Sequence, residues 1–370
     1  MEQFCQDKIK IAIVGAGPAG VYCALQLGKC FNEIDFNNYQ VYIFDKAQAL
    51  RTLLPTGNGR CNITNSIIDI KEFCSNYPRG EKFLYSVFHH YFSVEALEYF
   101  KEIGVDTYIQ DDGRIFPKSN SSKDVKDKLL QELKKYKNIK LVNKNIETCK
   151  DLKQFDKIII SAGSRGSENL IKSFNHTCIP FKKALCELKI NNFNYPTGVS
   201  VKSLDGDFIF TQDGISGPLA FKISSLNVDK KFPYEISIKL INFDDLYEMI
   251  QNNSKKSIGN ILSSFVPRSL AKNIAFDFDK KASEISKDNL RNMCNLKLNV
   301  VGVANKGEIV NAGGVDLDEL DKNFKSKIMD NLWFCGEVVN IDGFCGGFNL
   351  QNCWSGGYVV AKDVIRSIIK

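Results

Sequence analysis

Two glycine-rich segments at opposite ends of the chain carry residue types suited to binding a phosphorylated nucleotide. Near the N-terminus, Gly15, Gly17 and Gly20 form a Gly-x-Gly-x-x-Gly pattern directly after an apolar run. Near the C-terminus, Gly336 and Glu337 follow a second apolar run. Glycines let a backbone approach a pyrophosphate closely, and a carboxylate accepts hydrogen bonds from sugar hydroxyls. The first pattern alone predicts only that some dinucleotide binds here.

The elements expected around the first segment are a buried parallel strand over Lys8–Val14 and a helix over Ala19–Lys29. In such a unit the first glycine makes the tight turn, the second leaves room for the pyrophosphate, and the third lets the helix pack against the strand. A proline suits the first helical turn, whose free N–H groups attract phosphate. We therefore assign to cofactor binding Gly15, Gly17, Pro18, Ala19 and Gly20.

A second strand is expected over Val41–Asp45, after an extended polar connection at Asn32–Tyr39. This strand ends in an acid, and in a nucleotide-binding unit such an acid takes the ribose hydroxyls of an adenosine. Asp45 is therefore a cofactor-binding candidate. Lys46 follows it directly and joins the candidates, with a solvated surface lysine as the other interpretation.

The C-terminal segment predicts a strand over Asn331–Cys335, a glycine-rich turn, and a helix that reaches Ile365. Many flavoproteins end a late strand in this way, and the acid, here Glu337, takes the ribityl chain. Backbone N–H groups at the start of the helix then face the N1/C2=O edge of the flavin ring. The two segments together predict FAD rather than NAD. The C-terminal cofactor-binding candidates are Gly336, Glu337, Gly347, Asn349, Leu350 and Gln351.

Thr56–Asn65 is rich in glycine and polar residues and is expected to be a loop or the start of a short helix. Gly59 allows close approach to a ligand, and Arg60 can pair with a pyrophosphate or an anionic flavin edge. Cys61 is either a reactive thiol or a packed, inert cysteine. We assign all three to cofactor binding. No residue stands out as a general acid. The catalytic candidates, chosen by expected nearness to the flavin, are Arg60, Cys61 and Cys345, with Tyr358 as a further one.

Lys157–Gly163 reads as a buried strand that breaks at its glycine. In flavoproteins of this architecture the break lies near the adenosine, so Ala162 and Gly163 are cofactor-binding candidates. Arg114 belongs to a turn between two helical segments. It faces either the substrate or solvent, and the sequence leaves both interpretations open.

From about Leu185 the pattern changes to short strand-like runs and then to amphipathic helices. The fold class predicted is α/β: a Rossmann-like FAD-binding domain of the two-dinucleotide-binding-domain flavoprotein type, with an inserted β-barrel and helical lobe. The FAD-binding domain is discontinuous and covers 1–183 and 301–370. The inserted domain covers 184–300, with its helices at about 243–295.

Composition excludes several other classes of protein. The chain has 370 residues, 44% hydrophobic and 25% charged, which is typical of a globular protein. Neither a long apolar run nor a signal peptide is apparent, so no membrane association and a cytoplasmic location are expected. Twelve cysteines without a Cys-x-x-Cys pair and three histidines without ligand spacing predict no metal site. The net charge of +6 permits an anionic partner without requiring one, and the oligomeric state is left open.

The chain resembles the bacterial family of NAD(P)/FAD-dependent flavoproteins called BaiN-like or aminoacetone-oxidase-like. The matching segments are Thr56–Asn65, Gly113–Pro117, Phe210–Pro218, Ala312–Val315 and Gly336–Gly356. The resemblance implies noncovalently bound FAD and a barrel-plus-helices insertion. The chain departs from the family pattern at Asp45, where Glu is usual, at Gln212, where His is common, and at Cys345 and Phe348, where Thr and Tyr are common.

The resemblance implies an FAD-dependent oxidoreductase that transfers hydride through flavin N5, but it leaves the substrate open. Members are linked to amine oxidation, to reduction of carbon–carbon double bonds in steroid-like acids, and to dihydrouridine formation in ribosomal RNA. Only one strand–Gly-x-Gly-x-x-Gly–helix unit is present, so NAD(P)H is expected only as a transient reductant. A flavin-bearing RNA-binding module without turnover and a redox-responsive scaffold also stay open. If RNA binds, its phosphates are expected along Lys255, Lys256, Arg268 and Lys272.

Overall fold

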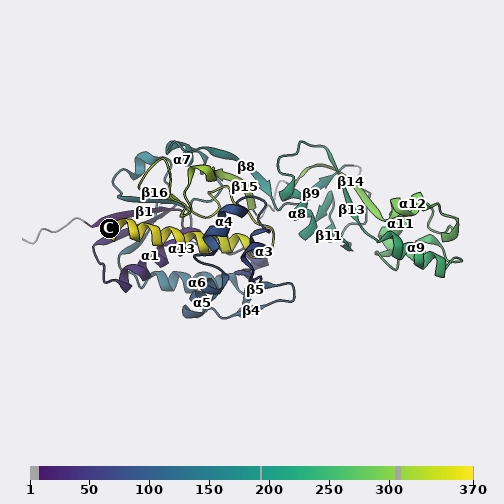
Figure 1. Cartoon of the computed structure of the whole chain (residues 1–370), viewed down its shortest axis with the longest axis horizontal. Helices are drawn as coiled ribbons and strands as arrows, with labels where there is room; N and C mark the ends of the chain where they lie inside the picture. Colours follow the sequence, from purple (N-terminus) through teal and green to yellow (C-terminus); the bar gives the residue numbers. More distant parts are fainter. Residues whose placement is uncertain (1–7, 192–193, 305–309, 370) are drawn as a thin grey trace, which may run out of the picture. The chain divides into compact units, whose positions relative to one another are not determined.

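The computed structural model describes residues 8–191, 194–304 and 310–369 (Figure 1). The chain divides into two compact units, Met1–Lys182 with Asn311–Lys370, and Lys183–Val310. The insertion predicted at 184–300 lies within the second unit, and the expected boundary at 300 falls inside strand β14 (Asn295–Val303). Within the described residues, no helix combines the length and apolar character needed to cross a membrane.

The first unit is built on a five-stranded sheet in the order β16-β7-β1-β2-β6, with every pair parallel. Its central strands are apolar because both faces of such a sheet are covered. This is the predicted Rossmann-like sheet, and it brings the carboxyl ends of its strands to one edge. The strands are β1 (Ile9–Val14), β2 (Tyr39–Asp45), β6 (Ile139–Asn143), β7 (Lys157–Ile160) and β16 (Leu332–Phe334).

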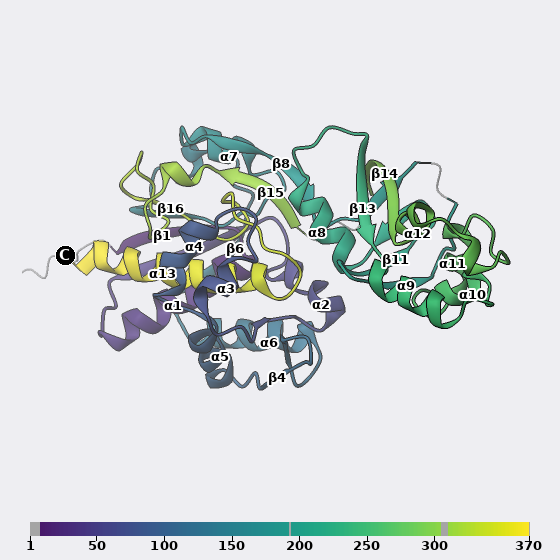
Figure 2. The same cartoon turned by 45° about the vertical axis from the view of Figure 1, so that its right-hand side comes forward.

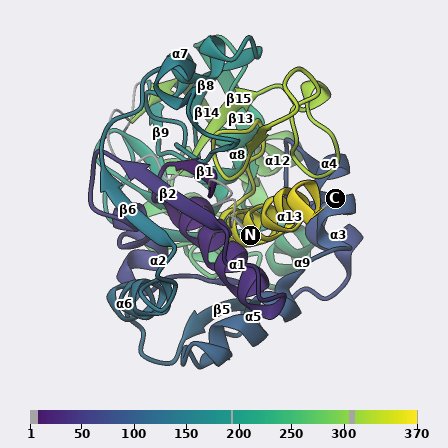
Figure 3. The ribbon, with the colours of Figure 1, turned by 90° about the vertical axis from the view of Figure 1, so that its left-hand side faces the viewer.

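The two longest helices of this unit, α1 (Pro18–Glu33) and α13 (Phe348–Ile369), pack side by side (Figure 3). Glycine makes the approach possible, because a Cβ added at Gly357 would lie 2.9 Å from the carbonyl oxygen of Ala19. The N-terminal and C-terminal motifs therefore share one core. The shorter helices of the unit are α2 (Thr56–Gly59), α3 (Ile70–Cys74), α4 (Glu81–Phe88), α5 (Ser93–Glu102), α6 (Ser122–Leu133) and α7 (Glu168–Ser173).

A three-stranded antiparallel sheet in the order β3-β5-β4 completes the first unit. Its strands are β3 (Thr64–Asn65), β4 (Thr107–Ile109) and β5 (Arg114–Pro117). The segment expected to be a loop or helix start is thus a short turn of helix followed by a strand. It becomes a strand because β5, distant in sequence, supplies hydrogen-bond partners, such as Ile115 O for Ile63 N at 2.8 Å.

The second unit holds a six-stranded antiparallel sheet in the order β10-β11-β12-β9-β14-β13 (Figure 2). A bond of 2.9 Å from Leu204 N to Lys239 O joins the β10–β11 turn to the end of β13, so the two edge strands meet at one end. Its strands are β9 (Leu188–Ile190), β10 (Ser200–Ser203), β11 (Gly206–Phe210), β12 (Gly214–Ser216), β13 (Tyr234–Lys239) and β14. Its helices are α8 (Pro218–Leu226), α9 (Phe243–Asn252), α10 (Ile258–Leu262), α11 (Arg268–Ile274) and α12 (Lys287–Met293).

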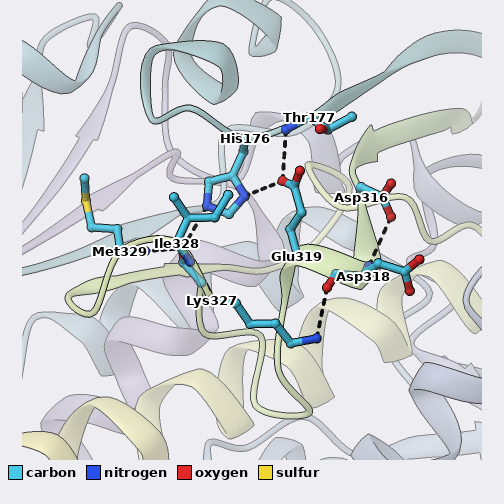
Figure 4. Close-up of polar contacts among 9 residues, drawn as sticks. His176, Thr177, Asp316, Asp318, Glu319, Lys327, Ile328 and Met329 are labelled. Atoms are coloured by element: carbon cyan, nitrogen blue, oxygen red, sulfur yellow. Dashed lines mark hydrogen bonds and ion pairs between the residues drawn. The ribbon is translucent and has the colours of Figure 1, made fainter.

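Two strands carry the chain out of the first unit and back, β8 (Cys178–Ala184) and β15 (Val310–Val315), and they pair with each other. A buried polar cluster lies beside them (Figure 4). His176 Nδ1 is 2.8 Å from Glu319 Oε2, and its Nε2 is 2.8 Å from Ser326 Oγ. This cluster ties the segment before β8 to the segment after β15.

The hydrogen bonds around Ser326 define the protonation state of His176. Ser326 Oγ accepts the N–H groups of Ile328 and Met329, so its own proton is donated to His176 Nε2. The imidazole therefore carries its proton on Nδ1 and donates it to Glu319. Burial lowers the pKa of His176, although Glu319 acts in the opposite direction. The neutral imidazole acts here as a structural bridge.

Candidate cofactor site

The glycines of the N-terminal motif serve different purposes. Gly15 has φ 106°, and an added Cβ would lie 2.3 Å from the carbonyl oxygen of Ser161, so this position requires glycine for packing. At Gly17 φ is −77°, and the nearest atom to an added Cβ is Thr52 Oγ1 at 3.7 Å. No protein group therefore demands a glycine at Gly17, and the space in front of it is open to a ligand.

Asp45 fixes this loop in place. Its Oδ2 accepts the N–H of Ala16 and its Oδ1 accepts that of Ala47, both at 2.8 Å. Each oxygen retains a lone pair for a ribose hydroxyl. A hollow of about 370 Å³ lies beside the carboxylate, and the exposed Lys46 forms part of its wall. Further residues of the wall are Ala16, Gln48, Val142 and Asn143.

Ala162 and Gly163 lie at the same edge of the sheet, directly after β7. An added Cβ at Gly15 would reach Ala162 Cα at 2.8 Å, so the two turns are in contact. Gly163 has φ 70° and no atom near its missing side chain. The structure thus places these two candidates beside the glycine loop, and their contact with the cofactor stays a prediction.

Glu337 is the strongest indication of a ligand in the C-terminal half. Its side chain is half-buried, and among the described residues no group forms a hydrogen bond with its carboxylate. Burial raises its pKa to about 7, with Arg165 acting against this shift and Asp342 acting with it. A partly desolvated carboxylate without hydrogen-bond partners is costly. Hydroxyl groups of a bound ligand would remove that cost.

Gly336, which directly precedes Glu337, lies against the first helix. It has φ 78°, and an added Cβ would lie 2.7 Å from Ala19 Cβ. The strand end that carries Glu337 therefore packs directly on the first turn of α1. The residues predicted for the two halves of the site are neighbours in space.

The start of α13 offers free backbone donors. Because Gln351 N donates to Gly347 O at 3.0 Å, the N–H groups left without an intrahelical acceptor are those of Phe348, Asn349 and Leu350. The prediction for Gln351 is therefore corrected, since its amide is used and its buried side chain donates to Ser355 Oγ at 2.9 Å.

The turn before α13 is held by Asn349. Its Oδ1 accepts the N–H of Gly343 at 2.9 Å, and its Nδ2 donates to Gly343 O at 2.7 Å. The side chain of this candidate thus shapes the turn, while its backbone N–H remains free. We therefore expect Asn349 to contact the cofactor through its main-chain N–H and not through its side chain.

The Thr56–Asn65 segment clamps this same turn. Asn65 Nδ2 donates to Gly346 O at 3.0 Å, and Trp354 Nε1 donates to Ile63 O at 3.0 Å. An added Cβ at Gly347 would lie 2.4 Å from Thr64 O. Part of the polar and glycine density that predicted ligand contacts therefore serves to join the two motifs.

The catalytic candidates differ in their surroundings. Cys61 is completely buried, and burial raises its pKa to about 12. A thiol of this kind is packed and unreactive, which corrects its assignment as a catalytic residue. Cys345 is exposed, yet desolvation raises its pKa to about 11 against the effect of Arg114. It is therefore a thiol, not a thiolate, at neutral pH. Tyr358 stacks on Tyr91 with ring centroids 4.1 Å apart, well inside α13.

Arg60 is half-buried and lies over the ring of Phe116, with the guanidinium carbon 4.3 Å from the centroid. Its Nε donates to Gly57 O at 3.3 Å. Gly59 next to it is exposed, and no atom lies near its missing side chain. Both candidates thus border open space on the first unit.

One important pair escapes sequence reasoning. Asp342 is completely buried and receives two guanidinium nitrogens of Arg79, Nε and Nη2, the latter 2.5 Å from Oδ2. This bidentate pair anchors the start of the glycine-rich turn. Asp342 stands in a conspicuous motif, but nothing around Arg79 in the sequence indicates its partner.

A family model described as the HI0933-like protein Rossmann domain matches residues 9–363. The chain belongs to the HI0933-like family. This HI0933-like chain is 26% identical over 412 residues to a 3-dehydro-bile acid delta(4,6)-reductase of Clostridium scindens, covering 95% of this chain and 98% of the relative. It is 23% identical over 406 residues to a ribosomal RNA dihydrouridine synthase of Haemophilus influenzae, covering 96% and 98%.

Solved structures align with most of this HI0933-like chain, but with low sequence identities and TM-scores. L-proline dehydrogenase from P. horikoshii aligns over 98% of this chain and 94% of its own, at 11% identity and a TM-score of 0.38. Glycine oxidase from Bacillus cereus aligns over 97% and 96%, at 9% identity and a TM-score of 0.34.

Proposed function

We propose that this HI0933-like protein is an FAD-dependent oxidoreductase. The observation that carries the proposal is Glu337, a half-buried carboxylate without a hydrogen-bond partner among the described residues, directly after Gly336, which packs on the first turn of α1. The open space at Gly17 supports it from the other half of the site. A ligand with both a pyrophosphate and a polyhydroxyl chain suits this pair of features.

Different residues would bind different parts of the cofactor. The hollow beside Asp45 takes the adenosine, and the loop at Gly17 with the start of α1 takes the pyrophosphate. Glu337 accepts hydrogen bonds from the ribityl chain. The free N–H groups at Phe348–Leu350 and the positive end of the α13 dipole stabilise negative charge on the ring edge. When bound, FAD supplies hydride transfer at its N5 atom.

The reductant in this proposal is NAD(P)H, which binds transiently. The first unit contains one Gly-x-Gly-x-x-Gly loop between a parallel strand and a helix, and the FAD pyrophosphate uses it. A nicotinamide would therefore visit the flavin without a nucleotide-binding domain of its own. The substrate is an activated double bond, which receives the hydride. In the opposite direction, an amine would donate a hydride to the oxidised flavin.

Release of the cofactor tests the proposal directly. We expect the purified protein to be yellow and to release FAD, not FMN, on heat denaturation, because the adenosine half of the site is present. Chromatography of the supernatant distinguishes the two flavins. A colourless protein that cannot be reconstituted with added FAD would contradict the proposal.

A second candidate function is dihydrouridine formation in ribosomal RNA, and a lysine cluster in the second unit favours it. The segment at Lys255–Ser257 runs antiparallel to Lys280–Lys281, with Ser257 bridged to Lys281 and Ile258 N bonded to Lys280 O at 2.8 Å. Four lysines thus lie on two paired segments, and all four are exposed. None has a carboxylate partner within the described part of the chain.

Arg268 and Lys272 of α11 are predicted as phosphate contacts. Their side chains differ in how available they are to a phosphate. Arg268 lies over Phe278, 5.0 Å from the centroid, and donates to Asn260 Oδ1 at 3.3 Å. Lys272 is exposed. We therefore assign the phosphate contacts first to the lysine cluster, which we define as Lys255, Lys256, Lys280 and Lys281.

Salt dependence distinguishes an RNA substrate from a small molecule. Each phosphate neutralised on single-stranded RNA contributes a slope of about −0.7 to the dependence of log K on log salt. Replacing the four lysines of the cluster with Gln should therefore lower the slope by up to about 3. The measurement is fluorescence anisotropy of a labelled RNA fragment between low and moderate salt.

A matched variant replaces four exposed lysines of the first unit with Gln, and it should keep the wild-type slope. These control positions are Lys101, Lys134, Lys144 and Lys153. If wild-type protein binds RNA no better than a neutral control protein, and cells lacking it retain all dihydrouridine, the RNA function fails. The small-molecule oxidoreductase would then stand.

A further inference from the structure

Two arginines and two aromatic rings gather on one face of the β3-β5-β4 sheet. Arg114 and Phe116 are two residues apart on β5 and so share a face, and Tyr108 is opposite Phe116 in the register. The guanidinium carbons of Arg60 and Arg114 lie 4.3 Å and 5.6 Å from the Phe116 centroid. Phe116 is completely buried beneath them.

The charges on this face are only partly compensated. Arg114 pairs with Asp112 at 2.6 Å, and with side chains 39% and 52% exposed, such a pair is weak and readily exchanged. Arg60 has no carboxylate partner among the described residues, and its one protein hydrogen bond is from Nε to Gly57 O. Most of the donors on its planar fork are therefore available to a ligand.

This arginine pair, defined as Arg60 and Arg114, lies beside the turn that opens α13. Asn65 is opposite Arg114 in the sheet register, and its Nδ2 donates to Gly346 O in the turn. Arg114 also acts electrostatically on the Cys345 thiol. The pair is thus next to the end of the site that receives the flavin ring in the proposed function.

We propose that the arginine pair binds the carboxylate or phosphate group of an anionic substrate and so orients its reactive part toward the flavin. This inference rests on the proposed function, because the flavin position defines what is oriented. A guanidinium fork matches both oxyanions in a bidentate manner, and the ring beneath Arg60 limits the positions that the fork can adopt. A cationic amine would instead be repelled by the two guanidinium groups.

The cofactor's own pyrophosphate is the competing occupant, and it is less well placed. The loop at Gly17 and the first turn of α1 already provide free N–H groups and open space for it. Arg60 is instead attached, through Phe116 and the sheet, to the turn at the start of α13. If the pyrophosphate contacts Arg60, an Arg60 variant should lose affinity for FAD. If the substrate anion does, the variant should lose affinity for that anion.

The test titrates FAD-loaded protein with inorganic phosphate and, separately, with acetate, at constant ionic strength, and follows the visible absorbance of the flavin. In Arg60→Gln the dissociation constant for the preferred anion should rise by about tenfold or more, corresponding to one charge-assisted hydrogen-bond pair. Arg60→Lys should fall between wild type and Arg60→Gln, because it keeps the charge and loses the fork. Arg114→Gln should show a smaller rise.

The control is Lys118→Gln, which removes an exposed cation just past β5 and should leave the titration unchanged. Tighter binding of acetate assigns a carboxylic acid, and tighter binding of phosphate assigns a phosphate ester. The inference is overturned if Arg60→Gln titrates like wild type, or if it loses affinity for FAD and keeps its affinity for the anions.

Failure of the proposed function gives a different result. A wild-type protein that binds no FAD would refute the oxidoreductase, and calorimetric titration of the same protein with phosphate would still compare wild type with Arg60→Gln. Equal heats for the two proteins would then overturn the anion site as well.

Discussion

Gly17→Val is expected to abolish FAD binding while leaving the protein folded. The backbone at Gly17 is extended, with φ −77° and ψ −174°, a conformation that valine adopts readily. An added Cβ meets no protein atom nearer than Thr52 Oγ1 at 3.7 Å, so we expect the side chain to extend into the space proposed for the pyrophosphate. We expect affinity for FAD to fall by about a hundredfold or more, or about 3 kcal/mol. Quenching of flavin fluorescence by the apoprotein measures it.

Two further glycines separate ligand loss from unfolding. Gly302→Val also adds a side chain in open space, but in the second unit, and should leave FAD affinity unchanged. Gly15→Ala should destabilise the fold itself, because its Cβ would lie 2.3 Å from Ser161 O and its φ is positive. Wild-type FAD affinity in Gly17→Val would show that the pyrophosphate does not lie over this loop.

The parts of the fold that could be predicted from sequence are those encoded locally. The apolar run before Gly15, the helix start at Pro18 and the strand that ends at Asp45 are each set by adjacent residues, and the structure has them there. Turn chemistry and periodicity contain this information without reference to distant segments.

The parts that could not be predicted depend on contacts between distant segments. Thr64–Asn65 becomes a strand because β5 pairs with it, and Cys61 becomes inert because the core closes around it. The sequence predicts Gln351 at the flavin edge because the position of the helix cap is not evident from sequence. The N–H of Gln351 donates to Gly347 O and is therefore not available to a ligand. Glycine density indicated a site but did not distinguish ligand contacts from packing contacts.

The buried ion pair between Arg79 and Asp342 is another such contact, and removing it should have the largest effect on stability. Arg79→Met would leave the completely buried carboxylate of Asp342 without its bidentate partner. Breaking one side of a buried pair costs about 3–5 kcal/mol, much of it from the charge left behind. We expect a loss of this size in the free energy of unfolding, measured by urea denaturation of the FAD-free protein. Arg79→Lys should lose less, since it keeps the charge.

Lys29→Met is the matched control, because it breaks an ion pair with Glu102 whose side chains are 36% and 58% exposed. It should cost no more than about 1 kcal/mol. Asp342 begins the turn that precedes the free N–H groups of α13, so Arg79→Met should also weaken FAD binding. Saturating FAD should then restore part of the stability, by about 2.7 kcal/mol at a hundred times its dissociation constant. If Arg79→Met is as stable as Lys29→Met, other groups satisfy the buried carboxylate, and the turn does not depend on this pair.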